Sequence, residues 1–162
     1  MTYSNGLIVE ALLAAGSHFA DNNLVSQSLG LLEWLVEVEW SPEGHFSFTP
    51  TGGRDPDGQG GFDQQPLEAW TLADACALAF DLTGEVRWRS AVRWAAQWFI
   101  GANDQETPMW DPATGAAFDG LTATGVNTNQ GAESTLAFIG TMLAYETTLA
   151  ASTGSPRKRA SR

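Results

Sequence analysis

Five segments of this 162-residue chain carry apolar residues at helical spacing, and the first two segments match the next two. Apolar side chains that recur every three or four positions predict amphipathic helices. The predicted helices cover residues 6–20, 24–35, 66–82 and 88–99, and a fifth helix follows the sequence NQGAEST. A shift of 64 residues superimposes the first pair on the second without a gap, so that Trp34 meets Trp98. Each unit is therefore predicted to be a helical hairpin.

Each predicted hairpin is followed by a long polar loop, residues 41–62 after the first and 101–130 after the second. Repeated hairpins of this length indicate either a solenoid or a closed α/α toroid. Long structureless loops are uncommon unless they are functional, and both loops end where the first helix of the next unit begins. Because no segment has the pattern of a buried strand, we expect an all-α fold of αα-hairpin repeats that forms part of a toroid.

The apolar stripes of the outermost predicted helices are well defined. In the first helix the stripe is Ile8, Ala11, Leu12, Ala15 and Phe19, and in the fifth it is Leu136, Ile139, Gly140 and Leu143. These patterns predict which residues are helical.

Length and composition predict one domain over residues 1–150, with residues 151–162 as a disordered basic tail. With 43% apolar residues the chain can form a real core. The net charge is −11, or about −15 without the tail, so the body should repel nucleic acid and anionic membranes. Cys76 is the only cysteine, which excludes a disulfide framework and predicts a small buried hydrophobe. The sequence shows no membrane span and no secretory signal, which favours a cytoplasmic protein.

Polar residues recur where the predicted units begin. Gln65 and Glu68 open the third helix, and Gln130 and Glu133 open the fifth. A carboxylate in a first helical turn can cap its own helix and interact with the helix dipole. Alternatively, repeated carboxylates at one mouth can bind a shared ligand. The sequence leaves both interpretations open.

The loops add groups that suit a sugar. Carboxylates and amides hydrogen-bond sugar hydroxyls, aromatic rings cover the apolar ring faces, and glycoside hydrolysis needs two carboxyl groups. The candidate catalytic residues are Glu68, Glu133 and Asp63, and the candidate substrate-binding residues are Gln64, Gln65, Trp70, Asp119, Asn129 and Gln130. The loops also bring the aromatic candidates Phe46, Trp110 and Phe118.

Several loop residues have a simpler interpretation. Asp55, Asp57 and Asp111 stand beside proline or glycine, a context typical of turns. His45 has no partner visible in the sequence, so we expect no metal site there. We also expect no cofactor, because the chain has no phosphate-binding loop, HExxH or GxSxG motif.

Several motifs together resemble a known bacterial family. They are GHFSF, FDQQPLEA, WFIGAND, DPATGAAFDGL and GVNTNQGAESTLAF. The chain from Met1 to about Glu146 resembles helical domains that occur alone or C-terminal to group 1 glycosyltransferases. Their fold is similar to the α/α toroid of six-hairpin glycosidases. The resemblance implies that Asp63, Gln64, Gln65, Glu68, Asp119, Asn129, Gln130 and Glu133 line a pocket.

The length departs from that family pattern, because about two and a half hairpins are present where a closed toroid has six. We therefore expect the C-terminal part of a toroid, with apolar helix faces that a glycosyltransferase, the missing portion or a second copy would cover. The favoured function is a carbohydrate-processing domain acting on a glycan. The alternatives are a non-catalytic glycan-binding or glycosyltransferase-accessory domain, and a helical-repeat scaffold for protein interactions.

Overall fold

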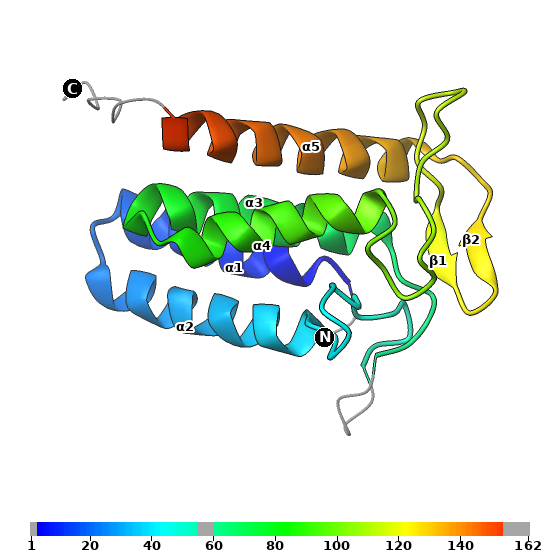
Figure 1. Ribbon diagram of the computed structural model, residues 1–162. Coiled ribbons are helices and arrows are strands. Elements are labelled where there is room, and N and C mark those ends of the chain that lie inside the picture. The colour runs from blue at the N-terminus through cyan, green and yellow to red at the C-terminus, as the bar shows by residue number, and fades with distance from the viewer. Residues whose placement is uncertain (1–2, 55–59, 154–162) are drawn as a thin grey trace.

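The computed structural model describes residues 3–54 and 60–153, and most of these residues are helical. All five predicted helices are present (Figure 1). They are α1 (Asn5–His18), α2 (Asn22–Glu39), α3 (Pro66–Thr83), α4 (Val86–Phe99) and α5 (Ala132–Thr153). A short antiparallel pair, β1 (Gly120–Thr122) and β2 (Gly125–Asn127), lies inside the second long loop. The expected class, a helical chain, is confirmed.

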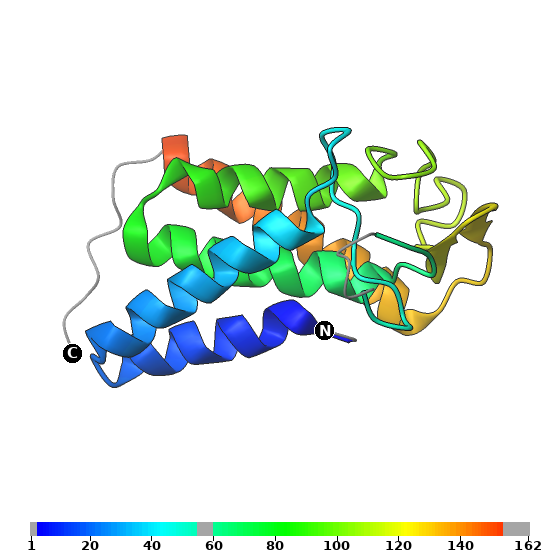
Figure 2. The same cartoon turned by 90° about the horizontal axis from the view of Figure 1, so that it is seen from below.

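The helices form two layers. Helices α1, α3 and α5 lie side by side in what we call the inner layer, α2 packs on α1, and α4 packs on both α3 and α5. Figures 1 and 2 show that α1, α3 and α5 all begin at one end of the molecule, where the long loops also gather. The fold thus collects the loop side chains and three helix N-termini in one region.

Local sequence explains where several helices begin and end. Asp21 caps α2 by accepting hydrogen bonds from the amides of Asn23 (3.1 Å) and Leu24 (3.0 Å). Pro66 occupies the first turn of α3, and Gly84 ends that helix with a φ of 71°. Asp111 forms the expected turn, because its carboxylate accepts the Ala113 amide at 2.8 Å. Asp55 and Asp57 lie outside the described residues.

The core side of α1 differs from its apolar stripe. Its buried residues are Gly6, Val9, Leu13 and Gly16. Ile8 and Phe19, from the predicted stripe, are 61% and 75% exposed. The stripe of α5 is also exposed at Leu136, Ile139 and Leu143, whereas Ala137, Thr141 and Ala144 are buried. The packed side of α1 therefore combines small residues with Val9 and Leu13, and several larger apolar residues of α1 and α5 remain exposed.

The first long loop contributes directly to the core. Phe46 and Phe48 are buried, and their stacked rings lie 5.3 Å apart. Phe48 also packs edge-on against Trp98 at 5.4 Å. Phe46 was expected to be available to a sugar, and this expectation is wrong because the ring has no exposed surface. The buried rings anchor the loop against α2 and α4.

Other expectations concern the chain as a whole. Cys76 is buried, as expected, and burial raises the pKa of its thiol. None of the helices in the described part of the chain has the length and hydropathy that a membrane crossing requires. Helix α5 continues to Thr153, and residues 154–162 of the predicted tail lie outside the described ranges.

Candidate functional site

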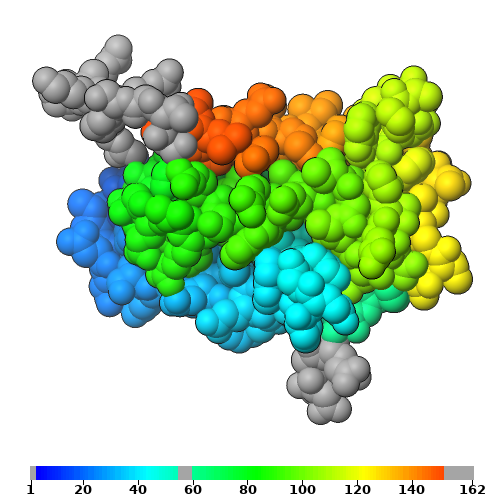
Figure 3. All heavy atoms as spheres, in the orientation of Figure 1, coloured from blue at the N-terminus to red at the C-terminus, as the bar shows by residue number. Residues whose placement is uncertain are grey.

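An open pocket of about 540 Å³ lies where the two long loops meet the C-terminal end of α2. Figure 3 shows these loop segments packed against each other on the surface. The pocket contains two aromatic side chains, Trp40 and Phe62, of which Phe62 is 40% exposed. Its charged lining residues among those described are Glu37, Glu43, Asp104 and Arg54.

Arg54 is fixed at the pocket by a buried carboxylate. Its guanidinium lies 3.0 Å from Glu39 Oε2 and donates to the Ser47 carbonyl at 2.5 Å. Glu39 Oε1 also accepts the Thr49 hydroxyl proton at 2.6 Å. Burial raises the pKa of Glu39, and the Thr49 hydrogen bond and Arg54 charge oppose that rise. The Arg54 guanidinium is therefore held in one place, and the Glu39 carboxylate offsets part of its positive charge.

Gln64 lies beneath the pocket rather than in it. The side chain is buried, and its oxygen faces the Phe48 amide (3.2 Å) and the Trp98 indole N–H (3.3 Å). Its nitrogen donates to the Gly61 carbonyl at 2.9 Å and to Asp104 Oδ2 at 2.7 Å. Gln64 was predicted to bind substrate directly. Its burial and its protein partners instead make it a residue that positions Asp104.

Asp104 also depends on its neighbour Asn103, which is 1% exposed. The Asn103 amide donates to the carbonyls of Trp98 (2.8 Å) and Thr107 (2.7 Å). Its oxygen accepts the amide of Gln105 at 3.1 Å. These bonds tie the start of the second loop to the end of α4, and they hold Asp104 over Gln64.

Glu68 is 4% exposed and binds the start of a neighbouring helix. Its carboxylate accepts the Asn5 backbone amide and the Asn5 side-chain amide, both at 3.0 Å, and also the Ser4 amide. These amides belong to the first turn of α1, where helix donors otherwise lack partners. Glu68 therefore caps α1 from α3, and the capping interpretation holds for a different helix than expected.

Glu133 lies exposed on the first turn of α5 and is held by Tyr3. The Tyr3 hydroxyl is 3.0 Å and 2.9 Å from the two carboxylate oxygens. The pKa of Tyr3 is raised by desolvation, by this hydrogen bond and by the charges of Glu133 and Glu68. Glu68 and Glu133 thus share one neighbour, but only Glu133 is accessible to solvent.

Asp63 and Gln65 lie close to β1. A side-chain atom added at Gly120 would be 2.6 Å from Asp63 Oδ1 and 3.3 Å from Gln65 Nε2. Asp63 Oδ1 is buried and has no hydrogen-bond partner among the described residues. A buried carboxylate oxygen without a partner is uncommon. Its predicted role in binding or catalysis stays a prediction.

Asp119 and its predicted neighbours organise the start of α5. Asp119 Oδ1 accepts the Gly131 amide and the Ser134 hydroxyl, both at 2.7 Å, and Oδ2 accepts the Asn129 amide. The Ser134 hydrogen bond is the main cause that lowers the pKa of Asp119, which the Gly131 and Asn129 bonds lower further. Gln130 pairs instead with Thr114, at 3.2 Å.

Trp70 is separate from the pocket lining. It is half-buried on α3 and lies so close to α5 that an added side-chain atom at Gly140 would be 2.3 Å from its indole nitrogen. It therefore acts first as a packing residue between inner helices.

The structure brings the predicted residues to the end of the molecule where the inner helices begin, but not into one pocket. The pocket itself contains residues that the sequence did not single out, chiefly Trp40, Arg54 and Asp104. Asp104 could have been found from the sequence, because it is the last residue of the WFIGAND motif, one of the motifs that carry the family resemblance. His45, expected to lack a partner, lies 3.5 Å from Asp104.

No protein-family model matches this chain, and no curated protein matches its sequence. The function of the pocket must therefore be argued from its own residues.

Proposed function

We propose that this chain binds a carbohydrate in the loop pocket, as a glycan-binding domain of a carbohydrate-processing system. The observation that supports this is the lining of the pocket, which combines the exposed ring of Phe62 and the indole of Trp40 with charged hydrogen-bonding groups. Aromatic rings can cover the C–H face of a sugar while carboxylates and a guanidinium bind its hydroxyls. A volume of about 540 Å³ lies within the usual range for small-ligand pockets.

The charges of the pocket favour a neutral or amino sugar. Glu37, Glu43 and Asp104 are acidic, whereas Arg54 is paired with the carboxylate of Glu39. The whole chain also carries a net charge of −11. An anionic sugar such as a uronate would be repelled by this field. A sugar that carries hydroxyl or ammonium groups would meet carboxylate acceptors.

The motif resemblance supports a place beside glycosyltransferases. Under this proposal the hairpins form part of a toroid like that of six-hairpin glycosidases, and the remaining hairpins or a glycosyltransferase would complete it. Neither Glu133 nor Asp63 lines this pocket, so a processing role for either would act on a part of the glycan that extends beyond the pocket. Glu133 is exposed, and Asp63 carries an unpartnered carboxylate oxygen among the described residues.

Glycan binding with matched phenylalanine variants tests the proposal. Purified protein is screened against neutral, amino and acidic oligosaccharides, and hits are titrated by calorimetry. Phe62→Ala should weaken binding about tenfold, because losing roughly 60 Å² of apolar contact at about 25 cal/mol per Å² amounts to about 1.5 kcal/mol. Phe19→Ala is the control, because Phe19 is also exposed but follows the far end of α1.

Two results would count against carbohydrate binding in this pocket. One is that no neutral or amino oligosaccharide binds. The other is that Phe62→Ala and Phe19→Ala leave the affinity of a bound glycan equally unchanged, which would move the site elsewhere.

A further inference from the structure

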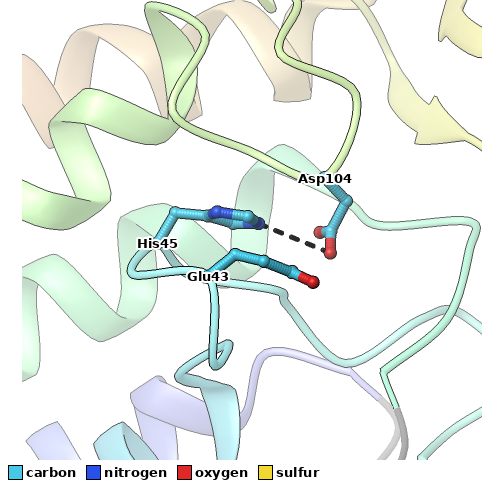
Figure 4. Close-up of side chains that lie close together, drawn as sticks. All are labelled: Glu43, His45 and Asp104. Atoms are coloured by element: carbon cyan, nitrogen blue, oxygen red, sulfur yellow. Dashed lines mark ion pairs between the residues drawn. The ribbon is translucent and has the colours of Figure 1, made fainter.

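Three potential metal ligands converge at the edge of the pocket. Glu43 and His45 come from the first long loop, and Asp104 comes from the second (Figure 4). Each residue offers one ligand atom, and these three atoms lie within 4.8 Å of one another. His45 Nε2 and Asp104 Oδ1 are 3.5 Å apart. Two ligands on one tetrahedral ion with bonds of about 2.0–2.1 Å are separated by roughly 3.3 Å, so this pair already has suitable spacing.

A tight turn presents Glu43 and His45 together. The backbones of Trp40 and Phe46 form an antiparallel β-bridge. Inside the turn that this bridge closes, the Ser41 amide donates to the His45 carbonyl at 2.8 Å. Gly44 separates the two ligands and has a φ of 92°, which favours glycine. The Ser41 hydroxyl donates to Glu43 Oε2 at 2.7 Å, which orients that carboxylate.

The carboxylate of Asp104 is oriented in a similar way. Its Oδ2 accepts the amide of the buried Gln64, whereas its Oδ1 faces His45. Gln64 is in turn fixed by the Trp98 indole. Hydrogen bonds of this kind, from residues behind the ligands, commonly orient carboxylates at metal centres. Two of the three ligands thus have supporting contacts.

His45 supplies the observation that points to a ligand. Its side chain is 15% exposed, and Nε2 is buried with no hydrogen-bond partner in the described part of the chain. The 3.5 Å approach to Asp104 Oδ1 is an ion pair only when the imidazole is protonated, and it does not satisfy hydrogen-bond geometry. Buried polar atoms nearly always have a partner. A neutral imidazole nitrogen in this position has a lone pair available for a metal ion.

We propose that Glu43, His45 and Asp104 form a binding site for a divalent transition metal ion of the zinc type. One imidazole with two carboxylates suits such an ion better than calcium or magnesium, which prefer oxygen ligands alone. Glu43 is exposed, so its side chain can move to close the site. Three protein ligands leave a coordination position open, and Glu43 and Asp104 line the pocket. A bound ion would therefore face the pocket and accept a water or hydroxyl oxygen in place of Glu43 and Asp104, and Glu37 would remain as a carboxylate acceptor for the sugar.

Zinc titration of the full chain, without any glycan, tests this proposal independently of carbohydrate binding. Calorimetry or competition with a chromogenic chelator should show one zinc ion per chain. His45→Ala and Asp104→Asn should weaken zinc binding about tenfold or more. The control is His18→Ala, because His18 is the only other histidine and lies exposed on α1. His45→Gln serves if the alanine variant does not fold.

The outcomes separate the proposal from its alternatives. Loss of zinc in the His45 and Asp104 variants, with His18→Ala unchanged, supports the site. Absence of stoichiometric zinc binding overturns it. Zinc binding that survives His45→Ala, or calcium binding that is equally tight and independent of His45, also overturns it, because the histidine would then not be a ligand.

Discussion

Asp74 of α3 and Glu10 of α1 are two carboxylates in partly buried surroundings. The pKa of Asp74 is raised to about 6, mainly by burial and also by the charge of Glu10, and a hydrogen bond with Trp70 opposes this rise. Burial also raises the pKa of Glu10. Ionising Asp74 in the folded protein therefore costs stability. The free-energy cost is absent below about pH 4, the pKa of Asp74 in the unfolded chain, because the carboxyl group is neutral in both states there. It reaches its full value above about pH 6, where Asp74 is ionised in the folded protein as well.

Asp74→Asn should stabilise the protein at pH 8. The full pKa shift corresponds to about 3 kcal/mol, and partial exposure reduces our expectation to about 1 kcal/mol. The gain should fall as the pH is lowered from 6 towards 4, because the native Asp74 becomes neutral there. Urea unfolding at pH 4, 5 and 8 measures this, with the exposed Asp81→Asn as control. A loss of stability at pH 8 would show that the carboxylate is needed.

Single residues also show where prediction from sequence stops. The position of Glu68 in a first helical turn was visible in the sequence, and so was the polar character of Ser4 and Asn5. The sequence could not show that Glu68 binds those two amides, because the contact depends on how α1 sits against α3. Gln64 is a similar case, because nothing in FDQQ distinguishes the buried glutamine from the half-buried Gln65.

At the scale of the element, the close approach of α1 to α3 depends on a glycine. A side-chain atom added at Gly6 would lie 2.4 Å from the carbonyl carbon of Thr71, which is backbone and cannot rotate away. Gly30 on α2 has no heavy atom within 4 Å of the same added atom. Gly30 is therefore a suitable control for Gly6, because both glycines lie in helices and only Gly6 faces a close neighbour.

Gly6→Ala should destabilise the protein by about 2 kcal/mol or more, because the helices must separate to admit the methyl group. Gly30→Ala should instead stabilise it by about 0.5–1 kcal/mol, since alanine is the better helix former. Denaturant unfolding of both variants checks the pair. Equal effects in the two variants would contradict close packing at Gly6.

The periodicity of apolar residues predicted all five helices. In α4 it also predicted the buried side, because the apolar positions from Trp88 to Phe99 at helical spacing are buried, but in α1 and α5 it did not. In α1 and α5 the larger apolar residues formed the obvious stripe, yet Gly6, Gly16 and Ala137 lie against neighbouring elements. Small residues allow helices to approach closely, so a face of weak hydrophobicity can be the packed one. The short strands β1 and β2 were also not predicted, because three residues each give too little pattern.

At the scale of the whole molecule, apolar surface is exposed on the two helices at the edges of the inner layer. Ile8 on α1 and Leu136 and Leu143 on α5 are each more than half exposed. We expect copies of this chain to self-associate through these faces, because burying apolar area is worth about 25 cal/mol per Å².

Light scattering across a concentration series tests this expectation. The wild type should exceed the mass of a monomer, and Ile8→Ser combined with Leu136→Ser should reduce it. Val86→Ser is the control, because Val86 is 58% exposed but lies on α4. A wild-type protein that is monomeric at all concentrations would contradict self-association through these apolar faces.

The assembly of the pocket could not be predicted at this scale either. Glu43 and Asp104 lie on different loops, and neither loop has a periodic pattern. They meet because Phe46, Phe48 and Asn103 tie both loops to the helical core. Such contacts between distant segments are specified by packing rather than by local sequence.

The two exposed stripes also limit the symmetry of any assembly. A contact between α1 of one copy and α1 of another is isologous, so it is satisfied in a dimer and stops there. A contact between α1 of one copy and α5 of the next is heterologous when the two copies make it only once, and it then leaves one α1 and one α5 uncovered at the ends. Successive copies would then add until a ring closes or a filament grows. The two stripes lie on different helices, so the second geometry would extend the inner layer from chain to chain.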